Sequence, residues 1–126
     1  MKIELQYRGQ KFNIYAIIND DGSIPAVEFL EQLKQSNPAS HKSLVAVYKR
    51  HADHGQIKNT LKSRFIKGRV NLLEFKSRQG DRILYFYLPN RKTVLTHGFH
   101  KGTPAEAEYR RAERIRDQYL REVENV

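Results

Sequence analysis

The sequence contains no cysteine, and no apolar run in it approaches the ~18 consecutive residues that a membrane-spanning helix requires. Without cysteine the chain forms neither disulfide bonds nor thiolate metal sites, which fits a bacterial cytoplasm. The N-terminus, MKIELQYRG, alternates apolar with polar residues and lacks the apolar core and the cleavage site of a signal peptide. We therefore expect a cytoplasmic protein with no membrane partner.

The sequence also lacks the signatures of the common enzyme classes. It has no glycine-rich phosphate loop, no serine nucleophile elbow and no dinucleotide-binding fingerprint. The pair His97 and His100 lies near a predicted strand end, the pair His51 and His54 lies on a predicted helix, and no acidic residue stands near either pair at a ligand spacing. We expect neither a metal ion nor another cofactor.

Acidic residues are scarce in the second part of the chain. Residues 1–40 hold four Lys or Arg and five Asp or Glu, whereas residues 41–126 hold nineteen and nine, for a formal charge of +9 overall. Between His41 and Ala105, fourteen basic residues stand against three acidic ones. Such asymmetry indicates a polyanionic partner, with nucleic acid as the first candidate. An acidic protein partner or a solubilising surface would also explain it.

The 126 residues suffice for a single domain, which we expect to span the whole chain. Alternating apolar residues predict a strand over residues 11–18, paired with residues 3–7 through a tight turn. A first helix is predicted to begin at Pro25, which is well suited to a first helical position. Asn37 and the proline after it indicate the start of a second helix, and Gly55 indicates its end.

Three strand-like runs follow a basic connection, at residues 70–78, 82–88 and 93–99, and the short separators between them suit antiparallel hairpins. The middle run is apolar on both faces, which is typical of a central strand covered on both sides. Thr103 then begins a helix with strong capping signals. One face of this helix is predicted to carry Ala105, Tyr109, Ala112, Ile115, Tyr119 and Val123.

The predicted fold is therefore α+β. It consists of a twisted antiparallel sheet, formed by the N-terminal strand and a three-strand meander, packed with two N-terminal helices and a C-terminal helix.

Basic side chains on neighbouring strands define the candidate site. In the run 70–78, Glu74, Lys76 and Arg78 share the side that faces away from the predicted core, and the next run opens with Arg82 after a two-residue turn. The catalytic candidates are Arg82, His100, Lys101 and Tyr109, and the RNA-binding candidates are Lys67, Arg69, Lys76 and Arg78. We expect Lys76, Arg82 and Lys101 to line one basic hollow.

A basic surface with His, Lys, Arg and Tyr suits cleavage of RNA by its own 2′-hydroxyl. That reaction needs a base, cations that stabilise the transition state and an acid for the leaving 5′-oxygen, and it needs no metal. Some of these residues also have a structural explanation. His97 alternates with Leu95 and Phe99, which favours a hydrogen-bonded core histidine, and Tyr109 lies on the apolar face of its helix.

The segments NLLEFKSRQGDRILYFY, VLTHGFHKGTP and AEYRRAERIRDQYL resemble the RelE/ParE superfamily of bacterial toxins, and within it the phage-derived HigB-type branch. The resemblance covers roughly residues 12–120 and implies a RelE-like fold. It implies a toxin of a type II toxin–antitoxin system, acting as a ribosome-dependent mRNA endonuclease that halts translation. The implied partners are the ribosome, mRNA and a cognate antitoxin, often a helix-turn-helix protein.

Carried over residue by residue, the resemblance places the strand arginine of the family at Arg82 and the basic position after the third strand at Lys101. The helix tyrosine falls on Tyr109, and Lys76 matches the arginine of a Leu-x-Glu-Leu-Arg strand. Glu74 departs from the pattern, since the best-known RelE-type nucleases carry a lysine there.

Two alternatives to RNA cleavage stay open at this point. A ParE-like protein would inhibit DNA gyrase without cutting RNA, and a phage-encoded basic protein could bind nucleic acid with no activity of its own.

Overall fold

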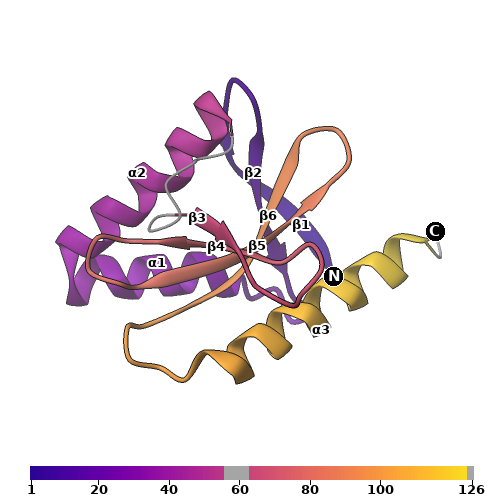
Figure 1. Cartoon of the computed structure of the whole chain (residues 1–126). Coiled ribbons are helices and arrows are strands. Elements are labelled where there is room, and N and C mark those ends of the chain that lie inside the picture. The colour runs from indigo at the N-terminus through magenta and orange to yellow at the C-terminus, as the bar shows by residue number, and fades with distance from the viewer. Residues whose placement is uncertain (56–62, 125–126) are drawn as a thin grey trace.

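The fold is an α+β arrangement of one mixed sheet and three helices in a computed structural model that describes residues 1–55 and 63–124 (Figure 1). In chain order the elements are β1 (Lys2–Arg8), β2 (Asn13–Ile18), α1 (Pro25–Ser36), α2 (Pro38–His54), β3 (Ser63–Phe65), β4 (Leu73–Lys76), β5 (Arg82–Leu88), β6 (Lys92–Phe99) and α3 (Ala105–Glu124). The strands lie in the order β1-β2-β6-β5-β4-β3. None of the helices in this part of the chain is both long and apolar enough to cross a membrane.

The sheet is not wholly antiparallel, so that part of the prediction is wrong. The β1–β2 hairpin and the β4–β5–β6 meander form as predicted, but β2 runs parallel to β6, with Asn13 opposite Lys92 and Ala16 opposite Leu95. A parallel pair needs a long crossover, and here the crossover includes both N-terminal helices and three strands. Strand patterns identify strands but do not specify such a distant partner.

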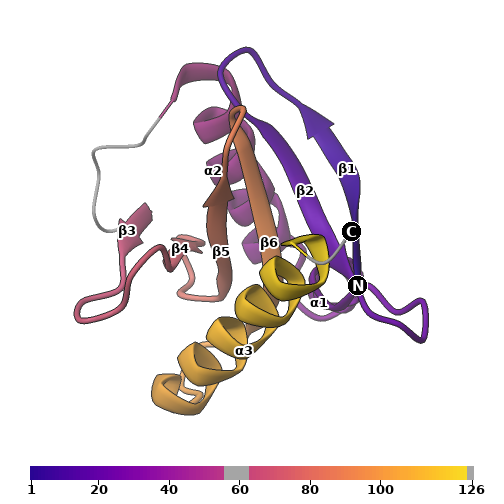
Figure 2. The ribbon, with the colours of Figure 1, turned by 90° about the vertical axis from the view of Figure 1, so that its right-hand side faces the viewer.

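Both faces of the sheet are covered, as predicted from the apolar run of β5. Helices α1 and α2 pack on one face and α3 crosses the other (Figure 2). Ile83 and Tyr85 belong to the core on the α1–α2 side, whereas Leu84 and Phe86 belong to the two clusters on the α3 side. All four side chains are fully buried, so β5 is a central strand that is covered on both faces.

The predicted helix starts and stops are confirmed at the N-terminal helices. Helix α1 begins at Pro25, and the Asn37 side chain accepts a hydrogen bond from the backbone N–H of Ser40, 3.2 Å away, at the start of α2. Gly55 ends α2 with a φ of 89°, a conformation that glycine adopts without a steric penalty.

Three predicted details are wrong. Residues 63–65 form β3 instead of a connection, because three residues are too few to show an alternating pattern. Strand β4 is shorter than the predicted run 70–78, since Asn71 has a φ of 49° and forms a turn. Val123 is exposed instead of buried, because α3 has there reached β1, the edge strand, where the Met1 amino group binds Glu122.

Candidate functional site

Lys76 and Arg82 are direct cross-strand partners at one end of the sheet. Arg82 is also opposite Phe99 of β6, so the three side chains project from the same face of three adjacent strands. The Arg82 guanidinium lies 5.8 Å from the centre of the Phe99 ring, within the range of a cation–π contact. The hairpin register thus places two of the predicted cations together on the face that α3 covers.

Glu74 lies at the centre of this group and is only 1% exposed. One carboxylate oxygen accepts a hydrogen bond from Arg64 Nε at 2.6 Å, and the other accepts one from Arg82 Nη1 at 3.3 Å. A buried carboxylate is tolerated only when such partners compensate its lost hydration. The hydrogen bond to Glu74 also raises the pKa of Arg64 above its ordinary value. Glu74 therefore holds two arginines in fixed positions.

Tyr109 of α3 completes this face of the site. Its ring packs edge-on against Phe99, with ring centres 6.4 Å apart, and the Arg69 guanidinium lies 5.7 Å from its centre. Interaction with the Tyr109 hydroxyl makes a small further contribution to the raised pKa of Arg64. The tyrosine therefore packs in the α3 core through its ring, while its hydroxyl lies near Arg64, one of the two arginines that Glu74 binds.

The other predicted RNA-binding residues differ in their exposure and in their ion pairs. Arg69 is mostly buried and forms ion pairs with Glu106 and Glu113 of α3. Lys67 is exposed in the turn that precedes it, and Arg78 is exposed beyond the end of β4. We call Glu74 and Arg82, together with Arg64 and Arg69 and their partners on α3, the paired arginine cluster.

Lys101 and His100 surround a second acidic residue, Asp81, in the β4–β5 turn. Asp81 Oδ1 accepts a hydrogen bond from the Lys101 backbone N–H at 3.1 Å and lies 3.4 Å from His100 Nδ1, while Oδ2 accepts one from the Ser40 hydroxyl. Burial would raise the pKa of Asp81, but these hydrogen bonds outweigh it, and the pKa lies below its usual value. The aliphatic part of Lys101 covers Gly80, where a Cβ would lie only 3.1 Å from Lys101 Cδ.

The predicted catalytic residues thus lie in two places. Arg82 and Tyr109 are on the α3 side of the sheet, together with Lys76. His100 turns toward α1 on the other side, with its ring centre 5.0 Å from that of Phe29. Lys101 lies beside the turn that joins β4 to β5, with its aliphatic part against Gly80.

His97 has the position expected of a core histidine. It is 1% exposed, and its Nε2 lies 2.7 Å from a carboxylate oxygen of Glu108 on α3. Burial lowers its pKa below the ordinary value, although the Glu108 carboxylate opposes that effect.

Sequence reasoning missed Arg64 and Asp81. Arg64 lies on β3, which shows no strand pattern of its own, and Asp81 stands in a predicted turn, where acidic residues are common. A signal for Arg64 did exist, because an acidic residue on a covered strand needs a cationic partner on a neighbouring strand. That signal points to a basic residue on a strand beside β4, and Arg64 of β3, directly opposite Glu74, is such a residue.

Together, the fold and the site define a small basic α+β protein that holds buried arginine–carboxylate pairs at one end of its sheet. Residues 29–120 match the model of the family described as Phage derived protein Gp49-like (DUF891). The match covers most of the chain, so the protein belongs to the phage-derived Gp49-like family. This is a RelE/HigB-like family of toxins from toxin–antitoxin systems, which implies an antitoxin as partner. No curated protein matches the chain.

Proposed function

We propose that this protein is the toxin of a type II toxin–antitoxin system and that it cleaves mRNA on the ribosome, as a RelE-like enzyme of the HigB type. The observation that carries the proposal is the position of Arg82, which is paired with Glu74 and lies opposite Lys76 on one face of the sheet. Membership in a toxin family and the excess of positive charge support it.

The proposed reaction uses the RNA's own 2′-hydroxyl as nucleophile. The 2′-oxygen forms a bond to the adjacent phosphorus while the bond to the 5′-oxygen breaks, so the products are a 2′,3′-cyclic phosphate and a 5′-hydroxyl. The proton of the 2′-hydroxyl goes to a base, and the leaving 5′-oxygen takes a proton from an acid. No metal ion takes part in this scheme.

Arg82 and Lys76 are the cations that stabilise the negative charge that develops on the phosphate oxygens. Glu74 is a positioning residue, because it binds Arg82 from the buried side and holds the guanidinium in place before substrate arrives. Tyr109 is the proton-transfer candidate on this face. His100 and Lys101 are the further catalytic candidates; both lie around Asp81 in the turn before Arg82, although the His100 ring itself packs against Phe29 on the other side of the sheet.

Induced expression in a bacterial host tests this proposal. Wild-type protein should arrest growth and yield mRNA fragments whose 5′ ends cluster within translated codons. The Arg82→Ala variant should reduce cleavage about 100-fold or more, as expected when one preorganised charge-stabilising group is lost. Arg114→Ala is the matched control, since Arg114 is an exposed arginine on α3 and its loss should leave cleavage unchanged.

Other outcomes of the same experiment would contradict the proposal. Intact transcripts together with double-strand DNA breaks would identify DNA gyrase as the target. Intact transcripts and intact DNA, with normal growth, would leave a basic binding protein without toxic activity. Equal activity of the wild type and the Arg82→Ala variant would remove Arg82 from the mechanism.

A further inference from the structure

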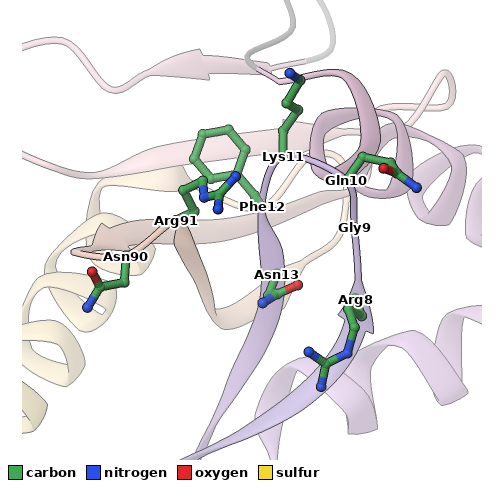
Figure 3. Close-up of a pocket in the computed structure, with 8 residues that line it drawn as sticks. All are labelled: Arg8, Gly9, Gln10, Lys11, Phe12, Asn13, Asn90 and Arg91. Carbon is green, nitrogen blue, oxygen red and sulfur yellow. The ribbon is translucent and has the colours of Figure 1, made fainter.

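A small basic pocket lies at the opposite end of the sheet from Arg82. It has a volume of about 250 Å³ and lies between the β1–β2 turn and the β5–β6 turn. Its lining includes Arg8, Lys11 and Arg91, and no acidic residue is among the residues that line it. Figure 3 shows the Arg91 guanidinium beside the Phe12 ring, with Arg8 and Lys11 extending in opposite directions from the two ends of the β1–β2 turn.

Backbone hydrogen bonds fix the walls of this pocket. The N–H groups of Lys11 and Phe12 both donate to the carbonyl of Ala52 on α2, at 2.7 and 2.9 Å. The N–H of Asn13 donates to the carbonyl of Arg91 at 2.9 Å, which joins the two turns. The pocket is therefore formed before any ligand binds, so binding does not have to order a loop.

The three cations have no carboxylate partner among residues 1–55 and 63–124. All three are exposed, and none forms an ion pair with a described residue. Asp53 of α2 contacts the β1–β2 turn, but its two oxygens accept hydrogen bonds from the Tyr7 hydroxyl and the Gln10 backbone N–H. The charges of Arg8, Lys11 and Arg91 are thus available to bind an anionic ligand.

Arg91 is also held in an unusual backbone conformation. Its φ is 59°, and the preceding Asn90 has a φ of 67°. Asparagine tolerates this left-handed region, whereas arginine rarely adopts it. Strain of this kind persists where a particular side chain is needed at that place. The turn keeps a guanidinium at the pocket where a residue such as glycine or asparagine would fit the backbone better.

We propose that this pocket binds a phosphate of a nucleic-acid backbone and forms a second contact surface, separate from the paired arginine cluster. Guanidinium groups match phosphate oxygens in geometry and charge. Further cations lie near the pocket in the chain. Lys49 and Arg50 are exposed on α2, with the Lys49 ammonium 5.3 Å from the centre of the Tyr7 ring, and Lys92, partly exposed on β6, follows Arg91. Several cations gathered on two turns and a nearby helix suit a polyanion of even charge density better than a peptide with scattered carboxylates.

The proposed binding at this pocket is independent of the proposed RNA cleavage, because a phosphate can bind there without any reaction. Its test therefore uses single-stranded DNA of about 20 nucleotides, which has no 2′-hydroxyl and so resists the proposed chemistry. RNA of the same sequence serves as the second probe. The test variant carries Arg8→Gln, Lys11→Gln and Arg91→Asn together, all at exposed positions.

The affinity for each probe is measured from low to moderate salt. The triple variant should bind both probes about tenfold or more weakly at low salt, and its plot of log affinity against log salt should be less steep by roughly 2, from about 0.7 per lost phosphate contact. A control variant with Lys34→Gln, Lys42→Gln and Arg121→Gln loses the same charge from exposed positions elsewhere. It should bind like the wild type, and circular dichroism and melting should show that both variants fold.

Three results would overturn the inference. The test and control variants could lose the same affinity, which would show a nonspecific effect of net charge. The test variant could bind DNA and RNA as the wild type does. With polyglutamate as a third probe, the test variant could lose only the binding of that polymer, which would identify an acidic protein partner instead. None of these results depends on cleavage, so they leave the proposed RNase activity to its own test.

Discussion

The two ends of the sheet use arginine in opposite ways. At one end, Arg64 and Arg82 share the buried carboxylate of Glu74, and Arg69 binds two acidic residues of α3. At the other end, Arg8 and Arg91 lie exposed around a pocket with no acid in its lining. Pairing fixes a guanidinium in place but cancels its charge at a distance. Exposed cations attract a polyanion from afar and hold it loosely.

This contrast indicates a division of work. The paired arginine cluster has the preorganised geometry that a reaction on one phosphate requires. The open pocket has the uncompensated charge that capture of a long anion requires. The following predictions disturb one end at a time.

The largest expected loss of stability comes from a change in the paired arginine cluster. Glu74→Ala removes the carboxylate that both arginines share, so we expect the free energy of unfolding to fall by about 3 kcal/mol, the lower limit for a broken buried pair because both arginines retain some contact with water. Urea unfolding measures this. Glu31→Ala, at an exposed position on α1, should change the stability by no more than about 0.5 kcal/mol. An equally small effect of Glu74→Ala would show that the pairs contribute little.

At the end of the sheet that carries the basic pocket, the β1–β2 turn packs on α2 only if residue 9 has no side chain. A Cβ at this position would lie 2.5 Å from both the Cβ and the carbonyl oxygen of Ala52. Gly9→Ala should therefore displace the β1–β2 turn from α2 and destabilise the protein by about 2–3 kcal/mol, as overpacking does. Gln10→Ala, in the same turn but exposed, is the control. If Gly9→Ala unfolds at the same urea concentration as the wild type, the turn does not pack on α2 as described.

The stability of the protein should fall in acid because of His51, which lies in the core near the basic pocket. This side chain is fully buried, with its ring stacked 4.7 Å from Phe12 and its Nε2 hydrogen-bonded to Thr93 at 3.0 Å. Burial lowers its pKa to about 4, below the value of about 6.5 in the unfolded chain. Its contribution to stability is therefore present above pH 6.5 and is lost as the pH falls toward 4.

Between pH 7 and about 5 this loss should reach about 2 kcal/mol. Urea unfolding at several pH values measures it in the wild type and in His51→Phe, which lacks the titrating group. The variant is less stable at pH 7, because Thr93 loses its partner, but its stability should fall less steeply with acid. Parallel curves for the two proteins would show that His51 is not responsible.

The smallest effect concerns the strained residue at the pocket. Arg91→Asn should raise the free energy of unfolding by about 0.5–1 kcal/mol, because asparagine tolerates the φ of 59° better than arginine does. The same variant should bind nucleic acid more weakly. A gain in stability with a loss of binding would show that the turn keeps arginine for its charge. Arg78→Asn, at another exposed arginine, should not increase stability.

The sequence predicted the local features of the fold well, because they depend on neighbouring residues. Pro25, Asn37 and Gly55 identified helix ends through their own backbone preferences. Lys76 and Arg82 lie close together as predicted, but the predicted two-residue turn is wrong. The Ser77 N–H donates to the Asp81 carbonyl, so residues 78–80 form a three-residue turn, and this turn places Lys76 directly opposite Arg82. Hairpins and caps are thus readable from a single sequence.

Features that depend on distant segments could not be predicted in this way. The parallel β2–β6 pair joins strands separated by most of the chain, and no local pattern encodes it. The Glu74–Arg64 pair required β3, which is too short to recognise. The side to which His100 turns depends on the position of Phe29 on α1. In each case the missing information lies in tertiary packing.

The parallel pairing of β2 with β6 has a consequence for how the protein is made. The β1–β2 hairpin emerges first from the ribosome, but the strand that joins it to the rest of the sheet ends only at Phe99. Contacts between such distant segments slow folding and have to await synthesis of the later one. The cell therefore completes nearly the whole polypeptide before the native sheet closes, which delays the appearance of folded protein relative to the start of its synthesis.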